Sequence, residues 1–293
     1  MQFGTVCIIG PGLIGGSIGR GLKKRNLAKT IIGVGHRPSS IEAAVKMHAI
    51  DKGTLHAGEA VKDADIVILA TSVNQIIDTA KKVIPCMKSN AILTDVGSTK
   101  HHIVQQITQN IREDIAFVGA HPIAGSEQRG VEFASPDLFV GCNCIITPLN
   151  NNAKGLETIS SLWQLLGAKI ICLSPEQHDE ILASVSHLPH LVASCLVNAI
   201  KQEYLVFGAS GLRDTTRVAS GDAELWANIF DHNRDNVIKS IDHFMAELAE
   251  FKNDLLKKNN TALLDKLQKA KVSRDSWFHN NSKIREETNK VNV

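Results

Sequence analysis

A short apolar run, a glycine-rich turn and an amphipathic stretch follow one another at the start of the chain. Residues 5–9 form the apolar run, the turn reads Gly10-Pro11-Gly12-Leu13-Ile14-Gly15, and the amphipathic stretch continues to about Arg25. In such a strand–turn–helix unit, the first glycine permits the tight turn, the second lets the backbone approach a pyrophosphate, and the third lets helix and strand pack closely. We therefore predict dinucleotide binding rather than a purely structural turn. The predicted contacts are Gly10, Gly12, Leu13, Ile14 and Gly15.

The end of the second predicted strand bears on cofactor choice. This strand covers residues 30–37 and closes on Gly35-His36-Arg37, where a NAD-specific site usually carries an acid for the ribose 2′-hydroxyl. Since Arg37 can pair with a 2′-phosphate, the sequence favours NADP, or use of both NAD and NADP. The alternative is that Arg37 is a solvated loop charge. The other predicted cofactor contacts are His36, Thr71 and Ser72.

Apolar strands and helical stretches alternate through the first half of the chain. Residues 64–71 and 91–96 are continuous apolar runs, the kind that a parallel sheet buries on both faces. Residues 143–147 and 169–173 add strands on either side of a helix at 156–166. The pattern predicts an N-terminal Rossmann-type doubly wound parallel sheet, an α/β fold, over residues 1–174.

A second pattern begins at Ser174-Pro175-Glu176, which is typical of a helix N-terminus with Ser as the cap and Pro in the first turn. Helical periodicity then covers residues 176–200, 223–256 and 262 to about 274, without strand-like alternation. We predict a C-terminal all-helical domain over residues 175–293, which serves substrate binding and dimerisation. The polar tail from Asn280 is expected to fray and is too short for a further regulatory domain.

Composition narrows the class of protein. The 293 residues are enough for two domains, and a net charge of +2 spread along the chain gives no footprint for nucleic acid or an anionic membrane. The N-terminus lacks the pattern of a secretory leader, and no apolar run approaches the roughly 18 residues that span a bilayer. We expect a cytoplasmic protein whose partner is a small molecule, with no nucleic acid and no membrane.

The six cysteines show no C-x-x-C pair and lie mostly within apolar segments. We interpret them as small buried hydrophobes in a reducing compartment. Cys142 and Cys144 would point to the same face of a strand, but no histidine stands near them in the sequence, so we predict no metal site.

One histidine follows a predicted buried strand at residues 115–118. The chain continues Gly119-Ala120-His121-Pro122-Ile123-Ala124-Gly125-Ser126. At the end of a strand, rigid backbone holds a side chain toward the crevice where α/β proteins bind ligands, and histidine is well suited to proton transfer near neutral pH. A nicotinamide and a base in one cleft indicate a dehydrogenase.

Four motifs together suggest a family. They are the turn at residues 10–15, Asp95-Val96-Gly97-Ser98-Thr99-Lys100, the His121–Gly125 run, and a helical pair made of Ser186-His187-Leu188-Pro189-His190 and Arg213-Asp214-Thr215-Thr216-Arg217-Val218-Ala219. With them the chain resembles the prephenate/arogenate dehydrogenases of tyrosine biosynthesis. The resemblance implies NAD(P)-dependent oxidative decarboxylation of prephenate to 4-hydroxyphenylpyruvate. Arogenate, the substrate of arogenate (cyclohexadienyl) dehydrogenases, is the alternative. The resemblance also implies a homodimer formed through the long helices.

The resemblance assigns roles to residues of these motifs. His121 would accept the proton of the substrate hydroxyl, Ser98 would orient that hydroxyl, and Arg217 would bind a substrate carboxylate. We also expect His187, Ser126 and Trp226 at the substrate, whereas the roles of His190 and Arg213 stay open.

Each assignment has a structural alternative. Ser98 could simply cap a helix that begins at Thr99 or Lys100, Arg217 could pair with Asp214, and the histidines and Trp226 could be core residues. Two other functions are possible. A β-hydroxyacid dehydrogenase would need a lysine in residues 176–200, which contain none, and a non-catalytic nicotinamide sensor would not need Ser98, His121 and Arg217 together.

Overall fold

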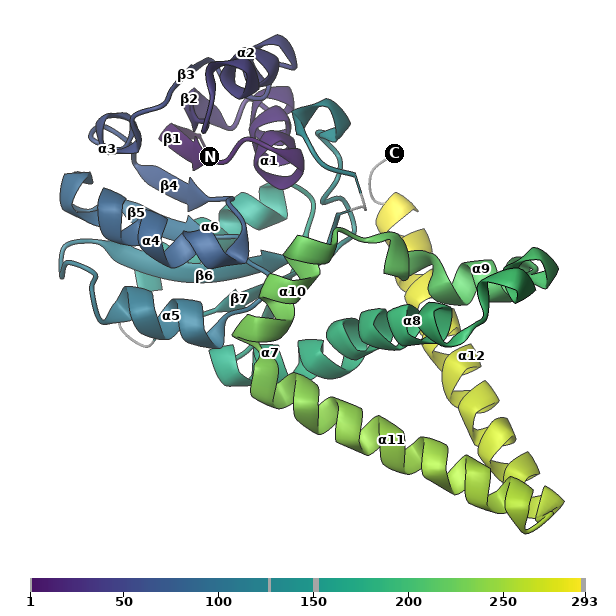
Figure 1. Cartoon of the computed structure of the whole chain (residues 1–293). Coiled ribbons are helices and arrows are strands. Elements are labelled where there is room, and N and C mark those ends of the chain that lie inside the picture. The colour runs from purple at the N-terminus through teal and green to yellow at the C-terminus, as the bar shows by residue number, and fades with distance from the viewer. Residues whose placement is uncertain (1, 126–127, 150–152, 291–293) are drawn as a thin grey trace. The chain divides into compact units, whose positions relative to one another are not determined.

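The computed structural model describes residues 2–125, 128–149 and 153–290, and by compactness the chain divides into two units, residues 1–236 and 237–293. The first unit contains the whole sheet (Figure 1). The strands are β1 (Phe3–Ile9), β2 (Ala28–Val34), β3 (Lys52–Thr54), β4 (Ile66–Leu69), β5 (Ile92–Asp95), β6 (Ala116–Pro122), β7 (Asn143–Thr147) and β8 (Lys169–Cys172).

The helices lie between and after these strands. The α-helices are α1 (Leu13–Lys24), α2 (Pro38–Lys46), α3 (Ala57–Ala60), α4 (Val73–Val83), α5 (His101–Thr108), α6 (Ala153–Leu165), α7 (Pro175–Leu182), α8 (Leu188–Ala199), α9 (Ser210–Thr216), α10 (Ala223–His232), α11 (Arg234–Leu256) and α12 (Asn260–Lys290). The short helical turns are η1 (Ile84–Cys86), η2 (Val131–Phe133), η3 (Ala183–His187), η4 (Gln202–Phe207) and η5 (Arg217–Ser220).

The strand order explains where a ligand can bind. It is β3-β2-β1-β4-β5-β6-β7-β8, and every neighbouring pair is parallel except β6 with β7. The chain therefore reverses its direction of winding between β1 and β4, and the carboxyl ends of these two strands leave a crevice outside the sheet. The predicted doubly wound sheet with additional strands is confirmed, and so is the all-helical character of the chain from α7 onward.

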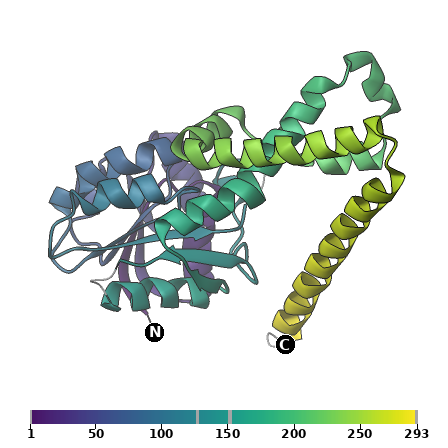
Figure 2. The same ribbon diagram turned by 90° about the horizontal axis from the view of Figure 1, so that it is seen from below.

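Alternate residues of each strand pack into two cores. Val6 and Ile8 of β1 pack in the core that contains side chains of α1, α2 and α6, whereas Cys7 and Ile9 pack in the core that contains side chains of α4 and α5. Figure 2 shows α4 and α5 on one face of the sheet and α6 on the other. Burial on both faces is the reason why the strands read as continuous apolar runs.

The start of α7 agrees with the sequence prediction. The Ser174 side chain accepts a hydrogen bond from the Gln177 backbone N–H at 3.2 Å, and the Gln177 side chain accepts one from the Ser174 N–H at 3.0 Å. This reciprocal capping box satisfies two backbone donors that no helical carbonyl can reach. The domain boundary at residue 174 stays a prediction, because the compact first unit continues to Asn236.

The predicted helix over residues 176–200 is interrupted. It consists of α7, a π-helical turn (η3) and α8. Pro189 has no N–H to donate to the Val185 carbonyl, so the regular α-helical ladder is broken at this point. The same stretch, Pro175–Ala199, is the one helix of the described chain that is apolar and long enough to cross a membrane by length and composition, contrary to our expectation, although a core helix of a soluble protein passes the same test.

Two further expectations need correction. The C-terminal helix continues to Lys290, so the predicted end near residue 274 is wrong.

All six cysteines are free, but only Cys7 and Cys144 are buried, while Cys172 and Cys195 are exposed. Cys172 lies on β8, an edge strand, where neighbours cover less of the chain. No metal-binding cluster of His, Cys, Asp or Glu occurs among the described residues.

Candidate active site

A cleft of about 2140 Å³ lies at the carboxyl ends of the strands in the first unit. Its volume is roughly twice the upper end of the range for a site that takes one drug-sized molecule, so a dinucleotide and a second ligand can share it. The predicted site residues that line it are Gly10, Gly12, Leu13, Ile14, His36, Arg37, Thr71, Ser72, Ser98, His121, His187, Arg217 and Trp226. Ser126 lies outside the described residues.

The glycine-rich turn fits a dinucleotide. Gly10 has a φ of +90°, and a Cβ atom there would lie 2.7 Å from the Ala70 carbonyl oxygen. A Cβ atom on Gly15 would lie 2.4 Å from the Gly10 carbonyl oxygen, so the third glycine serves close packing and does not line the cleft. The first turn of α1 has neither an acidic residue nor a side-chain cap. Its free N–H groups and the positive end of its dipole therefore suit a pyrophosphate.

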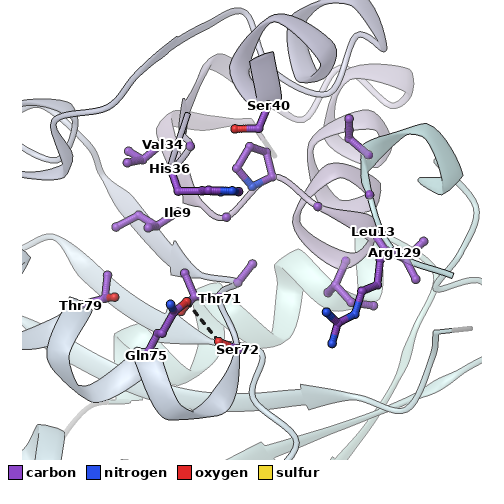
Figure 3. Close-up of a pocket in the computed structure, with 18 of the residues that line it drawn as sticks. Ile9, Leu13, Val34, His36, Ser40, Thr71, Ser72, Gln75, Thr79 and Arg129 are labelled. Carbon is purple, nitrogen blue, oxygen red and sulfur yellow. Dashed lines mark hydrogen bonds between the residues drawn. The ribbon is translucent and has the colours of Figure 1, made fainter. Parts of the chain in front are cut away.

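The ribose end of the cleft lies at β2 and α2. Figure 3 shows His36 and Ser40 beside the end of β2, across from Thr71 and Ser72. The exposed Arg37 lines the cleft and precedes the first turn of α2. A Cβ atom at Gly35 would lie 2.7 Å from Ser40 Oγ and 2.8 Å from Ile41 Cγ1. An acid at position 35 would therefore require these neighbours to move.

His121 belongs to a buried hydrogen-bond chain that the sequence did not reveal. It lies within β6, not just past it, and its Nδ1 is 2.8 Å from Nε2 of His178. Nδ1 of His178 is 2.7 Å from Oδ1 of Asp179. The same carboxylate accepts hydrogen bonds from the backbone N–H groups of Lys100 (2.7 Å) and His101 (2.9 Å), so that α7 caps the N-terminus of α5.

These contacts determine the charges in the site. Burial holds the pKa of His121 well below its usual range, and electrostatic repulsion from His178, Lys100 and His187 against a second proton acts in the same direction. Burial also lowers the pKa of His178. Burial alone would raise the pKa of Asp179, but its hydrogen bonds outweigh that effect and the pKa is lowered. At neutral pH, Asp179 is therefore ionised and both histidines are neutral.

His187 lies on the π-helical turn and also lines the cleft. Its Nδ1 is 3.1 Å from Nδ2 of Asn233, whose amide also donates to the Asp179 carbonyl oxygen at 2.7 Å. Burial lowers the pKa of His187 to about 4, so the ring is neutral at pH 7. Trp226 meets His187 edge-on and stacks on His190, with ring centroids 3.7 Å apart in the stacked pair.

Ser98 and Arg217 lie where a substrate could reach them, and the structural alternatives for both fail. The N-cap of α5 is Lys100 and Asp179 serves it, so Ser98 does not cap this helix. Within the described chain Arg217 has no ion-pair partner, because Asp214 pairs with Arg213 at 3.4 Å. Neither Arg213 nor His190 lines the cleft.

Three features of the site escaped sequence reasoning. Arg129 forms an ion pair with Asp222, and both residues line the cleft. Lys100 and Asp95 form an ion pair that is completely buried. The third is the His178–Asp179 pair. The adjacent letters His and Asp were visible in the sequence, but nothing there indicated that the pair would meet a strand 57 residues earlier.

Comparisons with known proteins agree with this geometry. Residues 18–172 match the family model of the prephenate dehydrogenase nucleotide-binding domain, and residues 174–269 match that of the prephenate dehydrogenase dimerization domain. Prephenate dehydrogenase of Bacillus subtilis is 33% identical over 279 residues, which cover 92% of this chain and 75% of the relative.

Two solved structures are similar over almost the whole chain. Prephenate dehydrogenase from A. aeolicus, in complex with hydroxyphenyl propionate and NAD+, has a TM-score of 0.88 and 33% identity, and covers 94% of this chain and 98% of its own. Arogenate dehydrogenase from Synechocystis has a TM-score of 0.81 and 29% identity, with coverage of 93% and 99%.

Fold and site together define a Rossmann-type oxidoreductase that uses NAD or NADP. The chain belongs to the prephenate dehydrogenase family. The resemblance inferred from the four motifs is thereby confirmed, as are the predicted fold class and the nicotinamide cofactor.

We expect acid to destabilise the protein through His187. Its pKa is about 4 in the folded protein and ordinarily 6.5, so the unfolded chain takes up a proton near pH 6 and the folded chain does not. Stability is therefore lost as the pH falls below 6.5, by about 2 kcal/mol at roughly pH 5 from this residue alone. Urea unfolding near neutral pH and near pH 5 measures the loss, which should be smaller in His187→Gln. Equal losses in both proteins would show that folding does not shift this pKa.

Proposed function

We propose that this protein oxidises and decarboxylates prephenate to 4-hydroxyphenylpyruvate, with His121 as the base. The observation that carries the proposal is that Ser98, His121 and Arg217 line the same cleft as the dinucleotide turn. These three residues come from a loop after β5, from β6 and from η5. A non-catalytic nicotinamide-binding protein would not need all three in one cleft. The bound nicotinamide would supply the hydride acceptor.

His121 is suited to accept the proton of the substrate hydroxyl. A base must be unprotonated to act. Because the pKa of His121 is lowered, its ring stays unprotonated down to pH values well below 6.5. Ser98 lies in the loop after β5, a strand that pairs with β6, and its side chain makes no hydrogen bond in the described part of the chain. Its hydroxyl is free to hold the substrate oxygen. Loss of the carboxylate as carbon dioxide then yields an aromatic ring, which makes the reaction strongly downhill.

Charge favours prephenate over arogenate. Prephenate and arogenate both carry two carboxylates, but arogenate also carries an ammonium group, which needs an acidic partner. Arg217 offers an uncompensated guanidinium to a carboxylate, and the nearby acid Asp222 is engaged by Arg129 and by the Leu225 N–H. Steady-state rates of NAD(P)H formation with each substrate test this preference. A higher kcat/KM with arogenate would contradict it, without affecting the assignment of the base.

We also propose a cytoplasmic homodimer whose subunits join through the helical part, residues 175–293. Several large apolar side chains are exposed there, among them Val206 (79%) and Phe207 (84%) of η4. Exposed patches of this kind are normally covered by a partner. The match to a family dimerization domain over residues 174–269 supports a boundary near residue 174 and a second copy of the chain as the partner.

The dimer proposal predicts that charge on η4 weakens self-association. Phe207→Glu should shift the protein toward monomer in sedimentation velocity, because a carboxylate would be buried without a partner. Leu55→Glu is the matched control. Leu55 is also exposed but directly follows β3, so this substitution should leave the sedimenting mass unchanged. A wild type that sediments as a monomer would refute the proposal.

For the base, we expect His121→Asn to bind the dinucleotide normally but to lose about 10²- to 10⁴-fold in kcat, the usual contribution of a general base. The wild-type rate should fall only at pH values well below 6.5, since the protonated ring cannot accept a proton and its pKa is lowered. Stopped-flow or steady-state rates across the pH range measure both. A variant with near wild-type turnover would exclude His121 as the base.

For the carboxylate site, Arg217→Ala should raise KM for prephenate much more than KM for the cofactor. The expected loss in kcat/KM is on the order of 2 to 4 kcal/mol. Arg213→Ala is the matched control, because Arg213 does not line the cleft and pairs with Asp214 in solvent. Similar losses in the two variants would show that Arg217 acts through the fold rather than through the substrate.

For cofactor choice, we propose measurable use of NADP, with Arg37 on the 2′-phosphate. Arg37→Ala should lower kcat/KM for NADP by about 10- to 100-fold, as expected for a charged hydrogen bond, and change that for NAD little. Lys62→Ala is the control, since this lysine also lines the cleft but lies beyond β3. A wild type that ignores NADP and an unchanged variant would make Arg37 a solvated charge. Gly35→Asp is a poor test because Ser40 and Ile41 occupy the space.

A further inference from the structure

The hydrogen-bond chain behind His121 has only one consistent arrangement of protons. Asp179 is ionised and can only accept, so Nδ1 of His178, 2.7 Å away, carries the proton between them. His178 is neutral, so its Nε2 has a lone pair. Nδ1 of His121 lies 2.8 Å from that lone pair and must therefore be the N–H donor. The unprotonated nitrogen of His121 is then Nε2.

A second branch of hydrogen bonds starts at the backbone carbonyl oxygen of Asp179 and leads to His187. The Asn236 amide donates to Asn233 Oδ1 at 2.9 Å, which fixes the orientation of the Asn233 side chain. The two N–H bonds of Asn233 then point to the Asp179 carbonyl oxygen at 2.7 Å and to Nδ1 of His187 at 3.1 Å. Nδ1 of His187 accepts, so in this neutral ring the proton sits on Nε2.

We propose that Asp179 and Asn233 place the protons of two cleft histidines in opposite ways, so that His121 is an acceptor at Nε2 and His187 is a donor through Nε2–H. This deepens the proposed function and rests on it where the substrate is concerned. His121 would take the hydroxyl proton, and His187 would donate a hydrogen bond to an anionic oxygen of the substrate. Asp179, His178 and Asn233 are positioning residues.

The branch to Asp179 also handles the charge that forms during the reaction. When the substrate O–H bond breaks and an N–H bond forms at Nε2, His121 becomes a cation whose other N–H already points at His178. The Asp179 carboxylate lies behind His178 and stabilises this cation, as the third member of a catalytic triad does. The other titratable groups that act on His121 are the Lys100–Asp95 ion pair, which is internally neutralised, and His187, which is neutral.

The proton positions can be measured directly on the full-length protein without substrate. In long-range ¹H–¹⁵N spectra of the histidine-labelled protein near neutral pH, a ring protonated at Nδ1 and one protonated at Nε2 give different cross-peak patterns. His121→Asn and His187→Asn identify the two sets of signals by their loss. We expect Nδ1–H for His121 and Nε2–H for His187. The same tautomer on both rings, or a mixture on His121, would overturn the proposal, whatever the substrate proves to be.

Kinetics separate the two branches. His178→Gln should lower kcat by about 10- to 100-fold with KM for prephenate changed less than about threefold, as for other residues that orient a reacting ligand. Asn233→Asp should instead raise KM by about tenfold, because its carboxylate would draw the His187 proton to Nδ1. His101→Gln, an exposed histidine paired with Glu176, is the matched control and should keep wild-type kinetics.

A purely structural role gives a different result. It would lower the melting temperature and the active fraction of His178→Gln and Asn233→Asp, but leave kcat and KM of the folded fraction unchanged. Active-site titration with bound cofactor measures that fraction. If His178→Gln keeps wild-type kcat while His121→Asn loses it, the base assignment stands and the positioning proposal fails. If both keep wild-type kcat, the proposed function fails as well.

Discussion

A buried carboxylate, that of Asp179, connects the parts of the first unit on which the site depends. Its oxygens receive the two free N–H groups at the start of α5 and the ring N–H of His178, while its backbone carbonyl receives Asn233 near the end of α10. A buried charge is tolerated only when its hydrogen-bonding capacity is filled in this way. As a result, the sheet, α7 and α10 meet at one point, and His121 and His187 are oriented from it.

The histidines of the site are kept neutral. A cluster of rings so close together would repel if they were protonated, and burial makes protonation still more costly. Positive charge is supplied by Arg217 at the cleft, whereas the charge of Lys100 in the interior is neutralised by Asp95. The proposed reaction needs both a neutral base and a cationic partner for carboxylates, and burial separates these two groups in the fold.

The cofactor end follows a simpler constraint. Glycines at positions 10 and 15 allow the turn and the close approach of α1 to β1, and the uncapped first turn of α1 leaves its N–H groups for the pyrophosphate. At the end of β2, packing around Gly35 excludes the acidic side chain that a NAD-specific site usually has there. The side chains of Ser40 and Ile41 occupy the position where an acidic side chain would begin, and the cation Arg37 stands beside it.

Local sequence determined the features that depend on neighbours in the chain. The apolar runs gave the strands, the glycine turn gave the dinucleotide site, and Ser174 with Pro175 gave the start of α7, because each is fixed by side-chain periodicity, glycine geometry or a cap within a few residues. Only the tertiary structure decided the rest. Asp179, not Ser98, caps α5, Arg217 stays free of Asp214, and His178 stands behind His121. These relations join residues that lie far apart in the chain, or depend on which of several neighbours a side chain meets, and no periodicity encodes them.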